Sequence, residues 1–211
     1  MVGAVRFDRD GVREGLSALT PWHRVGFAAG CVEVLLPAYS RFSELEEVGD
    51  PVLVRTVMDA VWTKLESADR SVSGGDLPSP DSIQELLPAE EDWNEWAPQA
   101  EDAIAALVYL LRLVRDDDVN LAVYAAERAY AAADEFEARK QELEVLDAHD
   151  RQMLLESSSV QVELRRQVES LEIFASPSRG PRRNRSAACR GYAKACWGWW
   201  WNRVEMPPWG A

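Results

Sequence analysis

The sequence predicts an all-α fold, a single compact domain of about six or seven helices. Apolar residues recur at helical spacing in several stretches, and most of these stretches follow a capping residue or a proline. No alternation of apolar and polar residues extends over four positions with turn signals on both sides, so no strand is expected. The 211 residues, 47% of them hydrophobic, suffice for one substantial core. We expect this domain over residues 1–175 and a tail over residues 176–211.

The first predicted helix is the central one. Thr20 is a candidate N-cap, and Pro21 follows it at the first helical position, where a missing N–H costs nothing. Apolar residues cover more than one face as far as Leu36, which is typical of a helix buried in the middle of a domain. His23, in the first turn, is expected near the surface.

The next two helices follow a proline each. A short helix is expected between Pro37 and Gly49. The pair Asp50-Pro51 then repeats the cap-and-proline signal before a broad apolar stripe over residues 53–65. Aromatic side chains on these helices are expected to anchor the core, namely Trp22, Phe27, Phe42 and Trp62.

Four further helices complete the domain. A short one covers residues 81–87, and a longer apolar one ends at Asp116. Asp118 caps an alanine-rich helix, whose small side chains permit close helix packing. A last amphipathic helix is expected from about His149 to Phe174.

The charge is strongly acidic, with a formal net value of −13. The tail holds seven basic residues and one glutamate, a net +6, which leaves −19 for residues 1–175. Such a domain repels phosphate backbones, so no nucleic-acid partner is expected for it; the charge favours a basic protein partner or serves solubility alone. The charged N-terminal stretch lacks the apolar region of a signal peptide, and no apolar stretch is long enough to span a membrane, so we expect a cytoplasmic protein.

The candidate binding residues are Glu33, Tyr39, Arg55 and Asp59. Glu33 interrupts an apolar helix, and a buried carboxylate needs a partner. Arg55 and Asp59, spaced i, i+4, lie on one face of the next main helix, so Arg55 could reach Glu33, with the Tyr39 hydroxyl nearby. The four residues form either a polar pocket for a small anion or partner side chain, or an ion-pair network that fixes helix register.

No catalytic, metal or cofactor site is predicted. The two histidines, His23 and His149, have no ligand partner at i+3 or i+4. The sequence has no nucleophile elbow and no phosphate-binding glycine-rich loop. Cys31 lies in an apolar helix and is interpreted as a small core residue.

Residues 14–174 resemble the YjaG-like family of bacterial proteins, known as domain of unknown function family four-one-six. The resemblance rests on two blocks, "LTPWHRVGFAAGCVEVLLPAYSRF" and "GDPVLVRTVMDAVWTKL". Its most specific positions are Trp22, Phe27, Glu33, Leu36, Pro37, Tyr39, Phe42, Gly49, Asp50, Arg55, Asp59 and Trp62. It implies an all-helical cytosolic protein without an established activity, loosely associated with bacterial signalling, and it supplies no catalytic residue.

The function expected from these observations is that of a non-enzymatic interaction or regulatory module with an unknown protein partner and unknown oligomeric state. One alternative is an immunity protein whose acidic surface covers a basic toxin. Another is a small-molecule enzyme with a polar pocket near Glu33.

The tail is basic and rich in tryptophan, with Trp197, Trp199, Trp200, Trp201 and Trp209 in its last fifteen positions. It is predicted to be disordered or to result from a change of reading frame. Because tryptophan has the single codon TGG, a shift of one nucleotide turns residues 199–202 into an apolar ending that contains Val-Val-Glu. Interleaved arginines and aromatic rings also suit stacking on single-stranded nucleic acid or anchoring at a membrane interface. Truncation after Ser176 is therefore expected to leave a cooperatively folding domain.

Overall fold

This computed structural model describes residues 4–67, 75, 77–87, 94–143, 147–176 and 187–193. Among these residues are eight helices and one further helical segment. No strand occurs among these residues, and the predicted all-α class is confirmed. The helices are α1 (Arg9–Ser17), α2 (Pro21–Glu46), α3 (Pro51–Glu66), α4 (Pro80–Gln84), α5 (Ala97–Asp116), α6 (Val119–Lys140), α7 (Ala148–Glu156) and α8 (Ser158–Ala175). Residues 187–193 form the additional segment.

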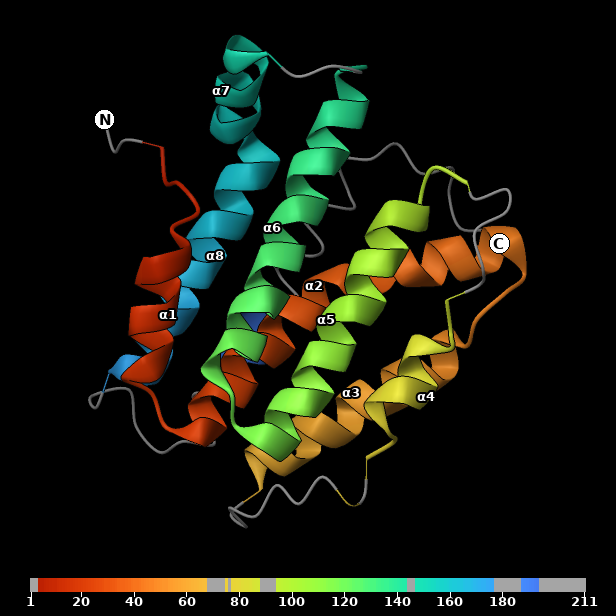
Figure 1. Cartoon of the computed structure of the whole chain (residues 1–211), viewed down its shortest axis with the longest axis vertical. Coiled ribbons are helices and arrows are strands. Elements are labelled where there is room, and N and C mark those ends of the chain that lie inside the picture. The colour runs from red at the N-terminus through yellow and green to blue at the C-terminus, as the bar shows by residue number, and fades with distance from the viewer. Residues whose placement is uncertain are drawn as a thin grey trace.

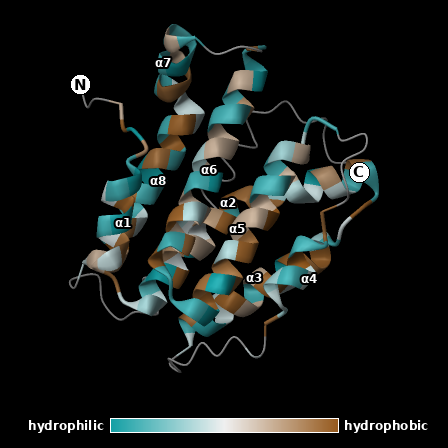
Figure 2. Ribbon diagram, viewed as in Figure 1, coloured by the Kyte–Doolittle hydropathy of each residue, from teal (hydrophilic) through white to brown (hydrophobic). Residues whose placement is uncertain are grey.

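α2 is the centre of the fold. Every residue from Val25 to Leu36 is buried, as expected for a helix that is apolar on several faces. In Figure 1, α5 and α6 lie side by side across α2, with α8 beyond α6, and α2 contacts all three helices as well as α3. Figure 2 shows apolar residues concentrated where α2 and α5 cross and hydrophilic residues on the outer faces of the helices.

Small side chains bring α6 close to its neighbours. The alanines of α6 that face inward are fully buried, because α2, α5 and α8 pack on this helix. These residues are Ala122, Ala125, Ala126, Ala129, Ala132 and Ala133.

The turn between α2 and α3 sets the position of α3. Gly49 has a φ of +78°, and a side chain there would collide with the Tyr39 hydroxyl. Asp50 then caps α3 by accepting a hydrogen bond from the Leu53 N–H at 2.8 Å. The Asp50 N–H in turn donates to the Tyr39 hydroxyl at 3.1 Å. This turn holds the start of α3 against the end of α2.

Helix boundaries differ from the prediction at three places. Pro37 lies inside α2 and does not end it, because burial of Ala38, Tyr39 and Phe42 beyond the proline outweighs the lost backbone hydrogen bond. The expected helix over residues 149–174 is divided at Ser157, whose extended backbone ends α7 and whose hydroxyl caps α8. α1 was not expected at all.

Two residues near the start of α2 also lie elsewhere than expected. His23 is buried rather than exposed, because α8 covers the first turn of α2 and places the Phe174 ring 5.3 Å from the imidazole. Trp22 is only half-buried and packs at the edge of the core.

The packed structure continues beyond residue 175. In the helical segment 187–193, Cys189 and Ala193 are fully buried, and the Cys189 thiol lies 3.6 Å from the Ser170 hydroxyl of α8. The predictions made for the rest of the tail, including the tryptophan cluster, fall outside the described residues. Among the described helices, none combines the length and the apolar character needed to cross a membrane.

Candidate functional site

Glu33 lies in the buried middle of α2, with only 4% of its surface exposed. Removing a carboxylate from water in such a place destabilises the fold by several kcal/mol unless hydrogen-bond donors and a cation replace the lost water. The compensating groups come from α3, which packs on α2.

Arg55 of α3 pairs with Glu33 through two hydrogen bonds. Its Nη1 donates to Oε1 at 2.8 Å, and its Nη2 donates to Oε2 at 3.1 Å. This two-pronged geometry is the strongest way to join a guanidinium and a carboxylate. Desolvation lowers the pKa of Arg55, but the hydrogen bonds and charge of Glu33 outweigh it and raise that pKa above its ordinary value. The pair that the sequence suggested is thus present.

Trp62 supplies the third donor. Its ring is fully buried, and its Nε1–H donates to Glu33 Oε2 at 2.8 Å. Arg55 and Trp62 are seven residues apart, two turns of helix, so they share one face of α3. Sequence reasoning treated Trp62 only as an apolar anchor. Its spacing from Arg55, opposite an isolated carboxylate, was the signal that could have revealed it as a donor.

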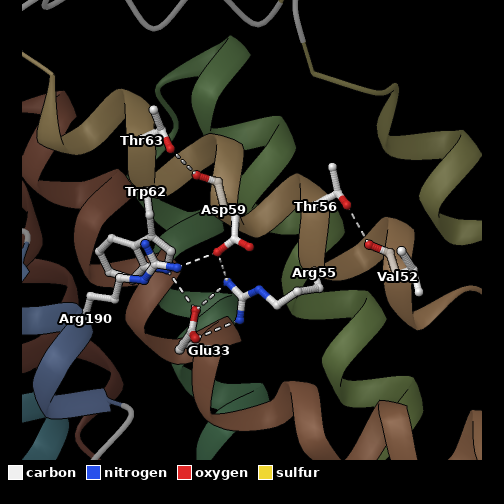
Figure 3. Close-up of polar contacts among 8 residues, drawn as sticks. All are labelled: Glu33, Val52, Arg55, Thr56, Asp59, Trp62, Thr63 and Arg190. Atoms are coloured by element: carbon white, nitrogen blue, oxygen red, sulfur yellow. Dashed lines mark hydrogen bonds and ion pairs between the residues drawn. The ribbon is translucent and has the colours of Figure 1, made fainter.

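Figure 3 shows how the polar contacts continue from Glu33 through Arg55 to Asp59 and Arg190. Asp59, one turn after Arg55, lies 3.0 Å from Arg55 Nη2 and is also bound by Arg190 of segment 187–193. The Arg190 guanidinium lies over the Trp62 ring, 5.7 Å from its centroid. The network therefore joins three parts of the chain, and the side chain of its outer member, Asp59, is 51% exposed.

Tyr39 belongs to a different part of the structure. It is six residues after Glu33, about 9 Å along the helix axis at 1.5 Å per residue, and its hydroxyl accepts a hydrogen bond from the Asp50 N–H in the α2–α3 turn.

Of the four proposed anchors, Phe27, Phe42 and Trp62 are buried, whereas Trp22 is half-buried.

A second buried ion pair, which sequence reasoning missed, lies between α8 and α2. Arg166 is fully buried and donates to both carboxylate oxygens of Glu163, at 2.7 and 2.6 Å. Its Nη2 also lies 3.3 Å from the Cys31 sulfur. Burial raises the pKa of the Cys31 thiol to about 12, even though Arg166 opposes this shift. A thiol that stays protonated is a poor nucleophile, so Cys31 is a core residue.

The arrangement around Glu33 is suited to holding helices together. Both oxygens of Glu33 accept hydrogen bonds from fixed donors, whereas a general base needs a lone pair directed at a substrate. Among the described residues, no group of three or more histidine, cysteine or carboxylate side chains could hold a metal ion.

A model of the family described as "Protein of unknown function (DUF416)" matches residues 11–182. The chain belongs to this family. Two relatives, "Uncharacterized protein YjaG" of Salmonella typhimurium strain LT2 and of Salmonella typhi, are each 30% identical over 97 residues, which is 46% of this chain and 48% of each relative. The match thus spans about half the length of these relatives.

A solved structure of another DUF416 family protein, from Shewanella baltica OS155, is similar to this chain. It has a TM-score of 0.71, with 87% of this chain and 92% of that chain covered, at 19% identity. At that identity the likeness shows the fold alone.

Proposed function

We propose that this DUF416 protein is a non-enzymatic interaction or regulatory module whose acidic exterior binds a basic protein partner. The proposal rests on how Glu33 is used. Its carboxylate, the most deeply buried charge of the candidate site, is taken up by Arg55 and Trp62. The polar groups of this site bond to one another. We therefore look for the binding region on the charged exterior of the protein.

The face formed by α5 and α6 is the part of that surface best suited to a cationic partner. Desolvation raises the pKa of Glu135; Arg139 lowers it, and repulsion from Glu101 and Asp134 raises it again. Burial likewise raises the pKa of the neighbouring Asp102 carboxyl to about 6 despite its ion pair with Arg128. A cationic partner would relieve this repulsion, and binding would weaken as salt screens it.

The test is charge reversal on this face. Partners that copurify from the bacterial host are identified, produced separately and titrated by calorimetry against the wild type and against the double variant Glu101→Lys/Glu135→Lys. The matched control is Glu14→Lys/Glu172→Lys, which makes the same change of charge on exposed positions of α1 and α8.

The expected result is a basic partner whose affinity falls at high salt and falls at least tenfold more in the α5–α6 variant than in the control. Two results would contradict the proposal. One is binding that is indifferent to salt and to both variants. The other is turnover of a small molecule that Glu33→Gln abolishes while the protein stays folded.

A further inference from the structure

A hollow of about 670 Å³ lies between the N-terminal segment, α6 and α7, away from the Glu33 network. Its lining combines aromatic and apolar side chains with two arginines. The residues that define it are Arg6, Phe7, Tyr130, Arg151, Gln152 and Leu155.

The N-terminal wall of the hollow is fixed to the helices. Gln161 of α8 accepts a hydrogen bond from the Val5 N–H at 2.9 Å and donates its amide to the Val5 carbonyl at 2.7 Å. Val5 and Phe7 pack against a small apolar cluster of Ala133, Val160 and Leu164. Val5 and Phe7 are half-buried, whereas Arg6 between them is exposed.

An aromatic pair forms the apolar wall. The rings of Phe7 and Tyr130 are stacked, with centroids 5.2 Å apart and planes only 8° from parallel. Both residues are half-buried, so part of this surface stays open to the hollow. Leu155 of α7 extends it.

The cationic wall consists of two arginines without an ion-pair partner among the described residues. Arg6 donates only to the neutral amide oxygen of Gln152, at 3.2 Å. The Arg151 side chain, which also lines the hollow, makes no hydrogen bond to any described residue. Carboxylates on α7 are already engaged: Glu156 accepts from the Gln152 amide, and Asp150 closes the capping box of the helix. Two uncompensated guanidinium groups at one hollow are notable in a chain with a net charge of −13.

We infer that this hollow binds a small organic anion, with an apolar or aromatic body against Phe7 and Tyr130 and a carboxylate or phosphate group held by Arg6 and Arg151. Guanidinium groups suit these two anions because they can donate paired hydrogen bonds to their oxygens. The aromatic wall removes the apolar body from water, so neither half of the ligand is expected to bind well alone.

The test uses the full chain and isothermal titration calorimetry with 1-naphthyl phosphate and 1-naphthoate. Inorganic phosphate carries the anion without the rings, and 1-naphthalenemethanol carries the rings without the anion. The variants are Arg6→Gln, Arg151→Gln and their combination, with Arg165→Gln as the control, because Arg165 is an exposed arginine of α8 that does not line the hollow. Thermal melts verify that each variant remains folded.

We expect at least one naphthyl anion to bind, each hollow arginine substitution to weaken its affinity about tenfold, and Arg165→Gln to leave the affinity unchanged. The relative affinity of phosphate and carboxylate identifies the preferred anion. The inference is overturned if both naphthyl anions fail to bind at millimolar concentration. It is equally overturned if inorganic phosphate or the alcohol binds as tightly, or if the control weakens binding as much as the hollow variants. No acidic residue of α5 or α6 lines this hollow. A failure of the anion-binding inference would therefore leave the proposed binding of a basic protein partner unaffected.

Discussion

At the residue scale, Trp62 combines two roles that usually fall to different side chains. Its indole ring fills the space between α2 and α3, and its N–H stabilises a buried charge. A buried acceptor that loses its donor costs about 1–3 kcal/mol, and more when the acceptor is charged.

Trp62→Phe is therefore expected to lower the free energy of unfolding by about 2 kcal/mol more than Trp22→Phe. Both changes exchange an indole for a phenyl ring, but Trp22 is half-buried and makes no hydrogen bond in the described structure. Urea denaturation of the two variants measures the difference. Equal losses would show that the indole N–H contributes nothing.

Asp102 is expected to make stability depend on pH. Its carboxyl has a pKa of about 6 in the folded protein, against an ordinary value of 3.8. The folded state thus binds this proton more tightly than the unfolded state, so the group's contribution is largest below pH 4 and declines until about pH 6. The decline should amount to roughly 2–3 kcal/mol.

Asp102→Asn removes the titrating group and leaves Arg128 charged at every pH. Between pH 4 and 7, the unfolding free energy of the wild type should fall relative to that of the variant. Denaturation curves at several pH values provide the comparison, and a constant difference between the two proteins would rule out the raised pKa.

The sequence revealed part of the Glu33 site. The pairing with Arg55 could be predicted because an isolated carboxylate in an apolar helix requires a cation. Tyr39 could not be placed, since its direction depends on a turn that packing determines. Arg190 was missed because it follows a long basic stretch without helical periodicity, where only tertiary contacts decide the structure.

At the scale of elements, the crossing of α2 and α8 depends on the absence of a side chain at Gly26. A Cβ there would come within 2.6 Å of the Phe174 ring. At Gly15 of α1, the nearest atom would be a Leu171 methyl group at 3.4 Å, an ordinary contact.

Gly26→Ala is accordingly expected to destabilise the protein by about 1–3 kcal/mol through overpacking. Gly15→Ala should stabilise it by about 0.5–1 kcal/mol, because alanine is the better helix former. Thermal melts of the two variants should shift in opposite directions. An unchanged or higher melting temperature for Gly26→Ala would contradict the close contact between α2 and Phe174, and a lower one for Gly15→Ala would contradict the ordinary contact at Leu171.

The presence of the helices was more predictable than their boundaries. Apolar periodicity marked α3, α5 and α6, and capping aspartates also marked the starts of α3 and α6. Pro37 was expected to separate two helices, and the cap at Ser157 was not predicted. At both positions the boundary depends on which residues are buried by packing, and the local sequence does not reveal this.

At the scale of the whole molecule, segment 187–193 changes the expectation for truncation. A chain ending at Ser176 would lose the buried Cys189 and Ala193 and would leave Asp59 without Arg190. A loss of roughly 2–4 kcal/mol follows from that burial, and the melting temperature should fall by roughly 5–15 °C.

A second truncation, after Ala193, serves as the control, because it keeps every contact of this segment. Its melting temperature should stay closer to that of the full chain than to that of the shorter chain. If the chain ending at Ser176 melts with the full-length protein, the segment contributes nothing, and the domain ends where the sequence predicted.

The coupling of Glu33 and Arg55 as one structural unit across α2 and α3 is tested most directly by a double-mutant cycle. Chemical denaturation of Glu33→Gln, Arg55→Met and the double variant gives the three free energies. Arg55→Met should cost more, because the Glu33 side chain that it leaves unpaired is 4% exposed. Glu33→Gln leaves an arginine side chain that is 36% exposed and still bound to Asp59. The double variant should cost less than the sum of the single changes by about 1–3 kcal/mol. Additivity within about 0.5 kcal/mol would contradict a structural ion pair at this site.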